Sequence, residues 1–188
     1  MSDLTVHRLE IRDVLVVRPQ RFRDERGYFV ETYHLHKFAE IGIDATFVQD
    51  NQSLSRLVGT VRGLHFQAPP AAQAKLMRVL SGSILDVVVD LRRGSPSYGR
   101  WCGTKLTAAG GEQLFVPRGF AHGFCTLEAD TEVAYKVDDY YAPECELGIF
   151  WNDPEIGIDW PVDAAAATLS DKDRGLPLLR DFASPFAM

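Results

Sequence analysis

The feature that most constrains the fold of this chain is a succession of short β-type segments separated by turn residues. Runs rich in Val, Ile, Phe, Tyr and Thr recur along the sequence, and Gly, Pro, Asn or Ser stand between them. The clearest runs span residues 13–22, 45–55, 59–67, 74–92, 99–106, 112–127 and 131–141. Many short strands at such spacing are typical of an antiparallel sandwich or barrel. The sequence therefore predicts an all-β fold.

Two short helices are expected beside these strands. Leu35, Phe38 and Ile41 recur at helical spacing, and Gly42 follows at a place where it can end the helix. A second helix is predicted to begin near LSDKD, residues 169–173. The prediction is thus a β structure with a few peripheral helices.

The strands are expected to form one domain over residues 1–188, because no internal repeat, low-complexity segment or linker divides them. A chain of 188 residues is also long enough to bury a sizeable core. Within this domain, Ser81-Gly82-Ser83 is predicted to be the turn of a β-hairpin. Residues from about 165 to 188 are expected to form a C-terminal helical extension.

Charge and cysteine content limit the possible partners and location. The net charge of −6 argues against broad nucleic-acid binding, although a few convergent basic side chains could still bind a small anion. No apolar run approaches the ~20 residues of a membrane span, and the first ten residues do not resemble a secretory signal. The cysteines Cys102, Cys125 and Cys145 are scattered and odd in number, which predicts reduced thiols and a cytoplasmic location.

Two glycine–histidine spacings match the signatures of the cupin barrel. Five residues separate Gly59 from His65 in the first. In the second, five residues separate Gly111 from Pro117, and His122 follows in PRGFAH. Because glycine, proline and histidine must all fall at the right offsets, this double match predicts a cupin-type jelly-roll barrel.

The same comparison argues against a metal site. The metal-binding version has a second histidine two residues after His65 and a glutamate a few residues later, but here Gln67, Ala71 and Ala72 occupy those positions. Transition-metal ions prefer three or more N, O or S ligands, and a nearby ammonium such as that of Lys75 repels them. The pattern therefore predicts a barrel that binds no metal.

His65 has two interpretations from the residues alone. A lone histidine in an apolar strand is most simply a hydrogen-bonded structural residue. However, Lys75, Asp86, His122 and Tyr135 also stand inside apolar strands, and buried ionisable groups are costly unless they are paired or functional. Such a number in one small barrel predicts a solvated polar pocket.

The strand VRGLHFQ decides whether Arg62 can share that pocket. Strand alternation places Val61, Gly63, His65 and Gln67 on one face and Arg62 on the other. Arg62 reaches the same cavity only if Gly63 forms a bulge or the strand end twists.

Taken together, seven collinear segments resemble the dTDP-4-dehydrorhamnose 3,5-epimerase family over residues from about 10 to 180. These segments are RFRDERGYFVE (21–31), FVQDNQSLS (47–55), VRGLHFQ (61–67), GSILDVVVDLRRGSPSYG (82–99), FVPRGFAHGF (115–124), YKVDDYYAPECELGIFWNDPEIGIDWP (135–161) and LSDKD (169–173). The resemblance implies a homodimeric jelly roll. It also implies a cofactor-free epimerisation of dTDP-4-dehydro-6-deoxy-D-xylo-hexose at C3 and C5 to dTDP-4-dehydro-L-rhamnose, on the route to dTDP-L-rhamnose.

The resemblance implies four catalytic positions. His65 matches the base, and a neutral imidazole is well suited to accept a proton near pH 7. Asp173 matches the carboxylate that orients this histidine, although Ser170-Asp-Lys-Asp173 is also a capping-box pattern that would open a helix. Lys75 matches the cation beside the sugar C4 oxygen, and Tyr135 matches the acid that reprotonates the opposite face.

Substrate-contact positions follow from the same resemblance. It implies that Phe22 stacks on the nucleotide base, that Arg26 contacts the nucleotide, and that the segment of about residues 1–30 packs on the dimer partner and completes its site. Arg62 and His122 match contacts to the sugar and diphosphate. The remaining matching positions are Glu31, Gln49, Asn51, Glu146 and Lys172.

Alternatives to this interpretation stay open at the level of sequence. Val137 and Asp138 stand where many relatives carry Cys or Ser and Thr, and their nearness to Tyr135 bears on whether one centre or two are inverted. A 4-keto-sugar mono-epimerase or a ketoisomerase would use the same acid and base. A non-catalytic cupin that only binds a sugar nucleotide would not need the base, its carboxylate and an opposite-face acid together.

Overall fold

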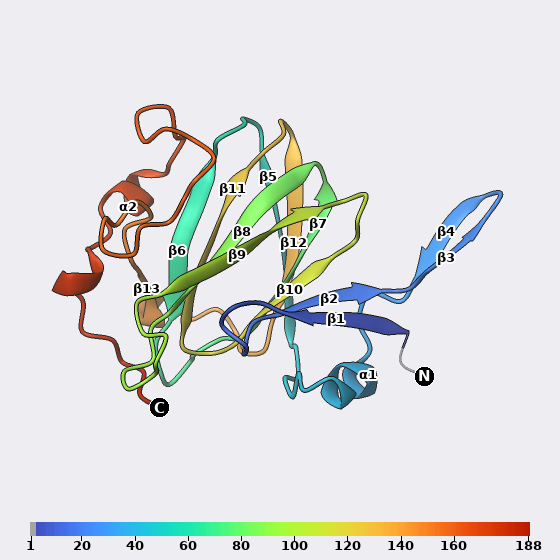
Figure 1. Cartoon of the computed structure of the whole chain (residues 1–188), viewed down its shortest axis with the longest axis horizontal. Helices are drawn as coiled ribbons and strands as arrows, with labels where there is room; N and C mark the ends of the chain where they lie inside the picture. Colours follow the sequence, from blue (N-terminus) through green and yellow to red (C-terminus); the bar gives the residue numbers. More distant parts are fainter. Residues whose placement is uncertain (1–2) are drawn as a thin grey trace.

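The computed structural model describes residues 3–188 and has two antiparallel sheets packed face to face (Figure 1). The first sheet has the order β1-β2-β10-β7-β12-β5. Its strands are β1 (Leu4–Arg8), β2 (Leu15–Pro19), β5 (Gln49–Ser55), β7 (Lys75–Ser81), β10 (Gln113–Val116) and β12 (Thr131–Val137). The prediction of an all-β jelly-roll architecture is confirmed.

The second sheet has the order β13-β6-β11-β8-β9. Its strands are β6 (Val61–Gln67), β8 (Ser83–Asp90), β9 (Trp101–Thr107), β11 (Phe120–Thr126) and β13 (Glu146–Gly148). In this sheet β11 lies between β6 and β8, although β11 comes after both in the sequence. Residues far apart in the sequence therefore become neighbours on the inner face of the sheet.

The space between the sheets is apolar over part of its volume. Alternate residues of each strand point inward, and the inward set forms one buried cluster that includes Ile84 and Val88 of β8, Phe120 and Phe124 of β11, and Met77 of β7. Ionisable residues take some of the remaining inward positions. The interior is therefore divided between a packed hydrophobic core and a polar cavity.

The outer face of each sheet is covered in part by peripheral segments. The C-terminal segment packs Ile156, Ile158 and Phe186 against the second sheet. Helix α1 (Leu35–Glu40) packs Phe38 against β2 and β7 of the first sheet. No helix among residues 3–188 is long and apolar enough to cross a membrane.

The short helices lie where the sequence predicts them. Helix α1 contains Leu35 and Phe38, and Gly42 follows it with a positive φ of 92°. Helix α2 (Asp171–Arg174) begins after Ser170, as expected. The region 165–188 contains α2 and the 3-10 turn η2 (Leu179–Asp181), with irregular backbone around them. A further 3-10 turn, η1, spans Pro143–Cys145, before β13.

The predicted hairpin at Ser81-Gly82-Ser83 is wrong. Strand β7 pairs with β10 and β12, whereas β8 pairs with β9 and β11, so Gly82 is a corner at which the chain crosses from one sheet to the other. Gly82 has a φ of 78°, and a Cβ on it would lie 2.3 Å from Oγ1 of Thr131. The glycine signals a tight turn in either case, and the sequence does not reveal which strands pair.

A two-stranded ribbon projects from the body of the molecule. Strands β3 (Arg21–Asp24) and β4 (Gly27–Val30) pair only with each other and extend beyond the sheets in Figure 1. Phe22, Tyr28 and Phe29 on this ribbon are 50%, 53% and 69% exposed. Three exposed aromatic side chains on one ribbon are typical of a surface that contacts another molecule.

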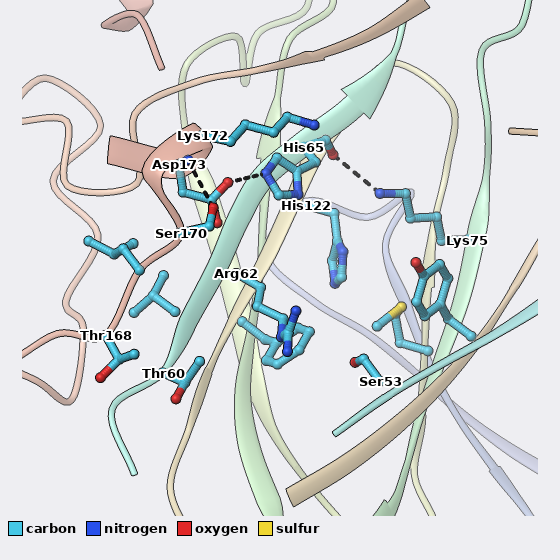
Figure 2. A pocket seen from close by; sticks show the side chains of 15 residues that line it. Ser53, Thr60, Arg62, His65, Lys75, His122, Thr168, Ser170, Lys172 and Asp173 are labelled. Atoms are coloured by element: carbon cyan, nitrogen blue, oxygen red, sulfur yellow. Dashed lines mark hydrogen bonds and ion pairs between the residues drawn. The ribbon is translucent and has the colours of Figure 1, made fainter. Parts of the chain in front are cut away.

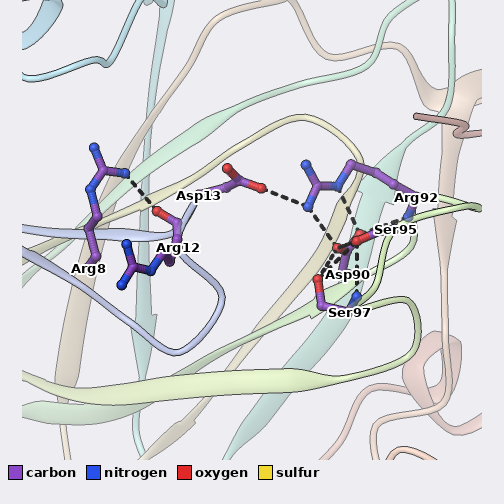
Figure 3. Close-up of polar contacts among 7 residues, drawn as sticks. All are labelled: Arg8, Arg12, Asp13, Asp90, Arg92, Ser95 and Ser97. Carbon is purple, nitrogen blue, oxygen red and sulfur yellow. Dashed lines mark hydrogen bonds and ion pairs between the residues drawn. The ribbon is translucent and has the colours of Figure 1, made fainter.

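The loop after β8 is organised by a buried carboxylate (Figure 3). Asp90 is completely buried and accepts hydrogen bonds from Arg92, Ser95 and Ser97 at 2.6–2.9 Å. Arg92 also pairs with Asp13 at 2.8 Å. Burial by itself raises the pKa of the Asp90 carboxyl. The hydrogen bonds together lower the pKa by more than burial raises it, so the pKa lies below its usual range.

We expect the substitution Asp90→Asn to destabilise the fold without affecting the cavity between the sheets. Loss of the negative charge weakens the charge-assisted bond with Arg92, which should lower the free energy of unfolding by about 2 kcal/mol. Urea denaturation of the variant and the wild type measures this difference. An unchanged free energy of unfolding would contradict the structural role given to Asp90.

Candidate active site

Strand β6 brings both Arg62 and His65 to the inner cavity. His65 pairs with His122 of β11, but Arg62 pairs with Phe124, so the register shifts by one residue between these pairs. This irregularity lies at Gly63, where a Cβ would come within 2.6 Å of the Cα of Gly123. The bulge that Arg62 needs is therefore present, and both side chains line the same cavity.

His65 is held by a carboxylate from the other end of the chain. Its Nε2 lies 2.5 Å from Oδ1 of Asp173, and Figure 2 shows this contact as a dashed line. Burial raises the pKa of the Asp173 carboxyl, but the hydrogen bond and charge of His65, together with hydrogen bonds from Ser170 and the backbone of Gly63, outweigh this effect, and the net pKa is lowered. An ionised Asp173 favours the tautomer of His65 that is protonated on Nε2, and this leaves Nδ1 free to accept a proton.

The helix-cap interpretation of Ser170-Asp-Lys-Asp173 is correct, and the cap leaves the side chain of Asp173 able to contact His65. The backbone N–H of Asp173 donates to Oγ of Ser170 at 3.1 Å, which caps α2. Because the cap uses the backbone N–H of Asp173, the carboxylate is free to contact His65. The cap fixes the first turn of α2, and this turn fixes the partner of the imidazole.

Lys75 and Tyr135 enter the cavity from the opposite sheet. Lys75 begins β7 and donates from Nζ to the backbone oxygen of His65 at 3.3 Å. Burial lowers the pKa of Lys75 to about 8, against the opposing attraction of Asp86 and Glu146. Burial, reinforced by Glu146, raises the pKa of Tyr135 above its usual value near 10. At pH 7 the cavity therefore holds an ammonium and a protonated phenol.

The cavity has a volume of about 410 Å³, which is suited to a sugar-sized ligand. His65 comes from the second sheet and Tyr135 from the first, so the imidazole and the phenol line one chamber from two walls. The lining residues are Ser53, Thr60, Val61, Arg62, His65, Lys75, Met77, His122, Phe124, Tyr135, Thr168, Leu169, Ser170, Lys172 and Asp173.

A second cavity of about 210 Å³ adjoins the first and shares His65, Lys75 and Tyr135 with it. Several predicted contact residues meet there. Its other lining residues are Gln49, Asn51, Phe66, Gln67, Gln73, Tyr141 and Glu146. The three shared residues thus stand where a larger ligand could extend from one space into the other.

Glu146 of the second cavity contacts Lys172 of the first cavity and Tyr141 of the second. Its carboxylate lies 2.5 Å from Nζ of Lys172 and accepts a hydrogen bond from the hydroxyl of Tyr141 at 2.8 Å. Gln49 donates to Asn51 at 2.9 Å. The predicted contact positions thus form two contacting pairs, Gln49 with Asn51 in the second cavity and Glu146 with Lys172 between the two cavities.

Arg62 and His122 differ in how free they are to contact a ligand. Arg62 donates to Oγ of Ser55 and to the backbone oxygen of Leu54, both at 3.0 Å, and has no acidic partner among residues 3–188. This leaves its charge uncompensated at the cavity. His122 is buried, and its Nε2 lies 2.5 Å from Oδ1 of Asp86.

Three predicted contact residues are not brought to the cavity within this chain. Phe22 and Arg26 lie on the projecting ribbon, where Arg26 pairs with Asp24 at 2.5 Å. Glu31 follows the ribbon and pairs with Lys37 at 2.8 Å. Their roles stay predictions that depend on a second copy of the chain.

The donor set of the cavity does not suit a transition metal. No group of three or more His, Cys, Asp or Glu side chains within residues 3–188 could hold a metal ion. Gln67 stands where a metal-binding cupin has its second histidine, and it is hydrogen-bonded to the backbone of Ala71, Tyr140 and Ala142. This glutamine has a structural role, since it ties two loops to β6.

Asp86 is the residue of the site that the sequence did not assign. The sequence predicts that it belongs to a polar pocket but indicates no role for it. Its position between Ile84 and Val88 on β8 places it on the inner face by strand alternation. That alternation is the signal that could have placed Asp86 in the interior beside His122.

The arrangement can support proton transfer at carbon next to a carbonyl group. It combines an imidazole oriented by a carboxylate, an ammonium, and a protonated phenol on the opposite wall. The imidazole can accept a proton, the ammonium can stabilise negative charge on an oxygen, and the phenol can donate a proton.

Comparisons with known proteins agree on one family. The family model described as dTDP-4-dehydrorhamnose 3,5-epimerase matches residues 8–181. A protein of Sinorhizobium fredii called dTDP-4-dehydrorhamnose 3,5-epimerase is 48% identical over 179 residues, which covers 95% of this chain and 91% of that protein.

Solved structures give the same result. The crystal structure of dTDP-4-dehydrorhamnose 3,5-epimerase from Bacillus anthracis with TDP and PPi bound has a TM-score of 0.90 and 49% identity, and the match covers 94% of this chain and 99% of that one. The Legionella pneumophila enzyme in complex with dTDP-4-keto-L-rhamnose has a TM-score of 0.91 and 41% identity, with 96% and 95% covered.

Proposed function

This chain belongs to the dTDP-4-dehydrorhamnose 3,5-epimerase family, and we propose that the cavity around His65 is where it performs that reaction. The protein is an isomerase that acts on carbohydrates, converting dTDP-4-dehydro-6-deoxy-D-xylo-hexose to dTDP-4-dehydro-L-rhamnose. The observation that carries the assignment of the site is the single chamber lined by His65, Lys75 and Tyr135 from its two opposing walls.

His65 is the base in this proposal. Its Nδ1 takes a proton from the carbon next to the C4 ketone, and Asp173 stabilises the imidazolium that forms. The electrons of the C–H bond move into the ring and give an enolate. Because an α-proton of a ketone is far less acidic than an imidazolium, the enolate must be stabilised for this step to proceed.

Lys75 supplies that stabilisation. Its ammonium is directed into the cavity, and a donor aimed at a developing oxyanion lowers the barrier more than it stabilises the neutral ketone. Tyr135 then donates its phenolic proton to the opposite face of the flat enolate, which inverts the centre. Two residues are needed because one imidazole cannot conveniently serve both faces.

We place the nucleotide in the second cavity, next to Gln49, Asn51 and Glu146, with Lys172 paired to Glu146 on the side of the first cavity. We further propose that a homodimer completes each site with Phe22 and Arg26 of the projecting ribbon and with Glu31, which follows it. The exposure of aromatic side chains on that ribbon supports this arrangement, as does its extension away from the sheets.

Incubation with dTDP-4-dehydro-6-deoxy-D-xylo-hexose in deuterated water tests the function. We expect NMR to show deuterium at both C3 and C5 together with formation of dTDP-4-dehydro-L-rhamnose. Deuterium and inversion at one centre would identify a mono-epimerase instead. A substrate that binds without exchange would indicate a sugar-nucleotide-binding protein.

A further inference from the structure

A second imidazole–carboxylate pair stands directly beside the first. His122 is the cross-strand partner of His65, and both imidazoles line the same cavity. Nε2 of each ring lies 2.5 Å from an aspartate Oδ1, that of Asp173 for His65 and that of Asp86 for His122. The proposed reaction uses the first pair for proton transfer; the family resemblance gives His122 a contact to the sugar or diphosphate, but it gives Asp86 no role.

The second pair is buried more deeply than the first. Asp86 is 0% exposed and His122 is 5% exposed. Oδ2 of Asp86 is buried and has no hydrogen-bond partner within residues 3–188. A buried carboxylate with an unpartnered oxygen is unfavourable for folding, so its presence between the apolar Ile84 and Val88 suggests a functional use.

The contacts of His122 define how its ring is protonated. An ionised Asp86 can only accept, so Nε2 of His122 must carry the hydrogen of their shared bond. The charged and titratable groups that face His122 are Asp86 from β8, Lys75 from β7 and His65 from β6. Burial lowers the pKa of His122 despite Asp86, and Lys75 and His65 lower it further, so a second proton is disfavoured.

We propose that Asp86 is a positioning residue that fixes His122 in the neutral tautomer protonated on Nε2, so that Nδ1 accepts a hydrogen bond from a hydroxyl of the hexose. Nδ1 of His122 has no hydrogen-bond partner among residues 3–188, while the ring lines the cavity. The hexose as ligand rests on the proposed function, whereas the tautomer does not.

This assignment gives the two histidines different tasks at one sugar ring. His65 accepts a proton from carbon, and His122 accepts a hydrogen bond from a hydroxyl without taking its proton. A cavity that already contains the ammonium of Lys75 and the phenol of Tyr135 is rich in donors. An acceptor fixed by Asp86 lets the site distinguish the orientation of the hexose by its hydroxyl groups.

The tautomer can be measured without any variant by 15N NMR of the imidazole nitrogens. We expect His122 to have a protonated Nε2 and a bare Nδ1 at pH 7, and the Nδ1 resonance to move when dTDP-L-rhamnose is added. A His122 protonated on Nδ1, or an Nδ1 resonance that does not respond to the bound sugar nucleotide, would overturn the proposal. An enzymatically inactive wild type would instead refute the proposed function and leave the tautomer untouched.

Kinetics then test whether Asp86 acts through His122. We expect Asp86→Asn to lower kcat/KM about 10- to 100-fold, the range found when the partner that orients a ligating histidine is removed. The double variant Asp86→Asn/His122→Asn should be no worse than the poorer single variant, because both changes remove one unit. Multiplicative losses, or an unchanged kcat/KM in Asp86→Asn, would contradict the proposal.

The chain offers a matched control on the same strand. Asp90 is another completely buried aspartate of β8, but it lies outside the lining of the cavity. Asp90→Asn should lower stability and leave kcat/KM within about twofold of the wild type. An equal loss of kcat/KM in both variants would trace the effect of Asp86 to general destabilisation and overturn its positioning role.

Discussion

The substitution His65→Ala is expected to reduce turnover at least about 1000-fold and to abolish deuterium exchange from solvent into the substrate. General bases contribute about 10²- to 10⁴-fold, and here the base also starts every turnover. Asp173 contacts His65 and stabilises the imidazolium that forms there. Alanine has no group that can accept the proton at this position. Rates of exchange and product formation, followed by NMR, measure both effects.

Binding should be almost unaffected by the same change. The proposed nucleotide contacts lie in the second cavity, where His65 is only one of the lining residues. Calorimetric titration with dTDP should therefore give a Kd close to that of the wild type. His36→Ala, at an exposed histidine of α1, is the matched control and should retain full turnover. Normal turnover in His65→Ala would show that the base lies elsewhere.

Loss of Lys75 has the second largest expected effect. Lys75→Met should lower kcat about 10²- to 10³-fold, as found when one donor to an oxyanion is removed. The methionine keeps the length of the side chain but cannot stabilise negative charge on the C4 oxygen. Lys105→Met, at an exposed lysine of β9, should leave kcat unchanged. A comparable loss in both variants would contradict the role of Lys75.

The pH dependence of kcat/KM gives an independent test of this lysine. Burial lowers the pKa of Lys75 to about 8, and its protonated form is the active one. Lys75 should therefore not limit activity below pH 8, and activity should fall as pH rises through 8 because the lysine loses its proton. The pKa of Tyr135 is raised, so the phenol stays protonated in that range.

Lys75→Arg should shift this decline to higher pH, because arginine stays protonated throughout the accessible range. A decline near pH 8 that persists in an otherwise active Lys75→Arg variant would have to come from another group. Stopped assays of kcat/KM between pH 6 and pH 10 measure the difference.

Local sequence patterns predicted the elements of this protein better than their pairing. Helix α2 follows from Ser170, and α1 follows from Leu35 and Phe38, because capping and periodicity are local properties. The crossing at Gly82 was mistaken for a hairpin, since a glycine with positive φ suits both a hairpin turn and a corner between sheets. Strand pairing depends on residues distant in sequence, and no local rule determines it.

The site residues that lie on strands could be predicted from the alternation of inward and outward side chains. His65, Lys75 and Tyr135 each stand at inward positions and meet in one chamber. The pairing of His65 with Asp173 depends on a contact across 108 residues, so only the family resemblance suggested it. Asp86 was recognised as an unusual ionisable residue, but its partner His122 lies on another strand.

The ribbon residues show a different limit. Phe22, Arg26 and Glu31 are far from the cavity in a single chain, and their proposed contacts require a second subunit. Neither the alternation of a strand nor the cap of a helix carries information about a partner. The exposure of Phe22 and Arg26 on a projecting ribbon is the physical feature that agrees with the prediction.

The central claim is that a proton leaves one face of the sugar to His65 and returns to the other face from Tyr135. Isotope exchange by Tyr135→Phe in deuterated water tests it most directly, because His65 and Lys75 remain in place. We predict that deuterium still enters the substrate while inversion falls by at least about 100-fold. Inversion at the wild-type rate, or exchange that declines in parallel with inversion, would contradict this division of labour between the two faces.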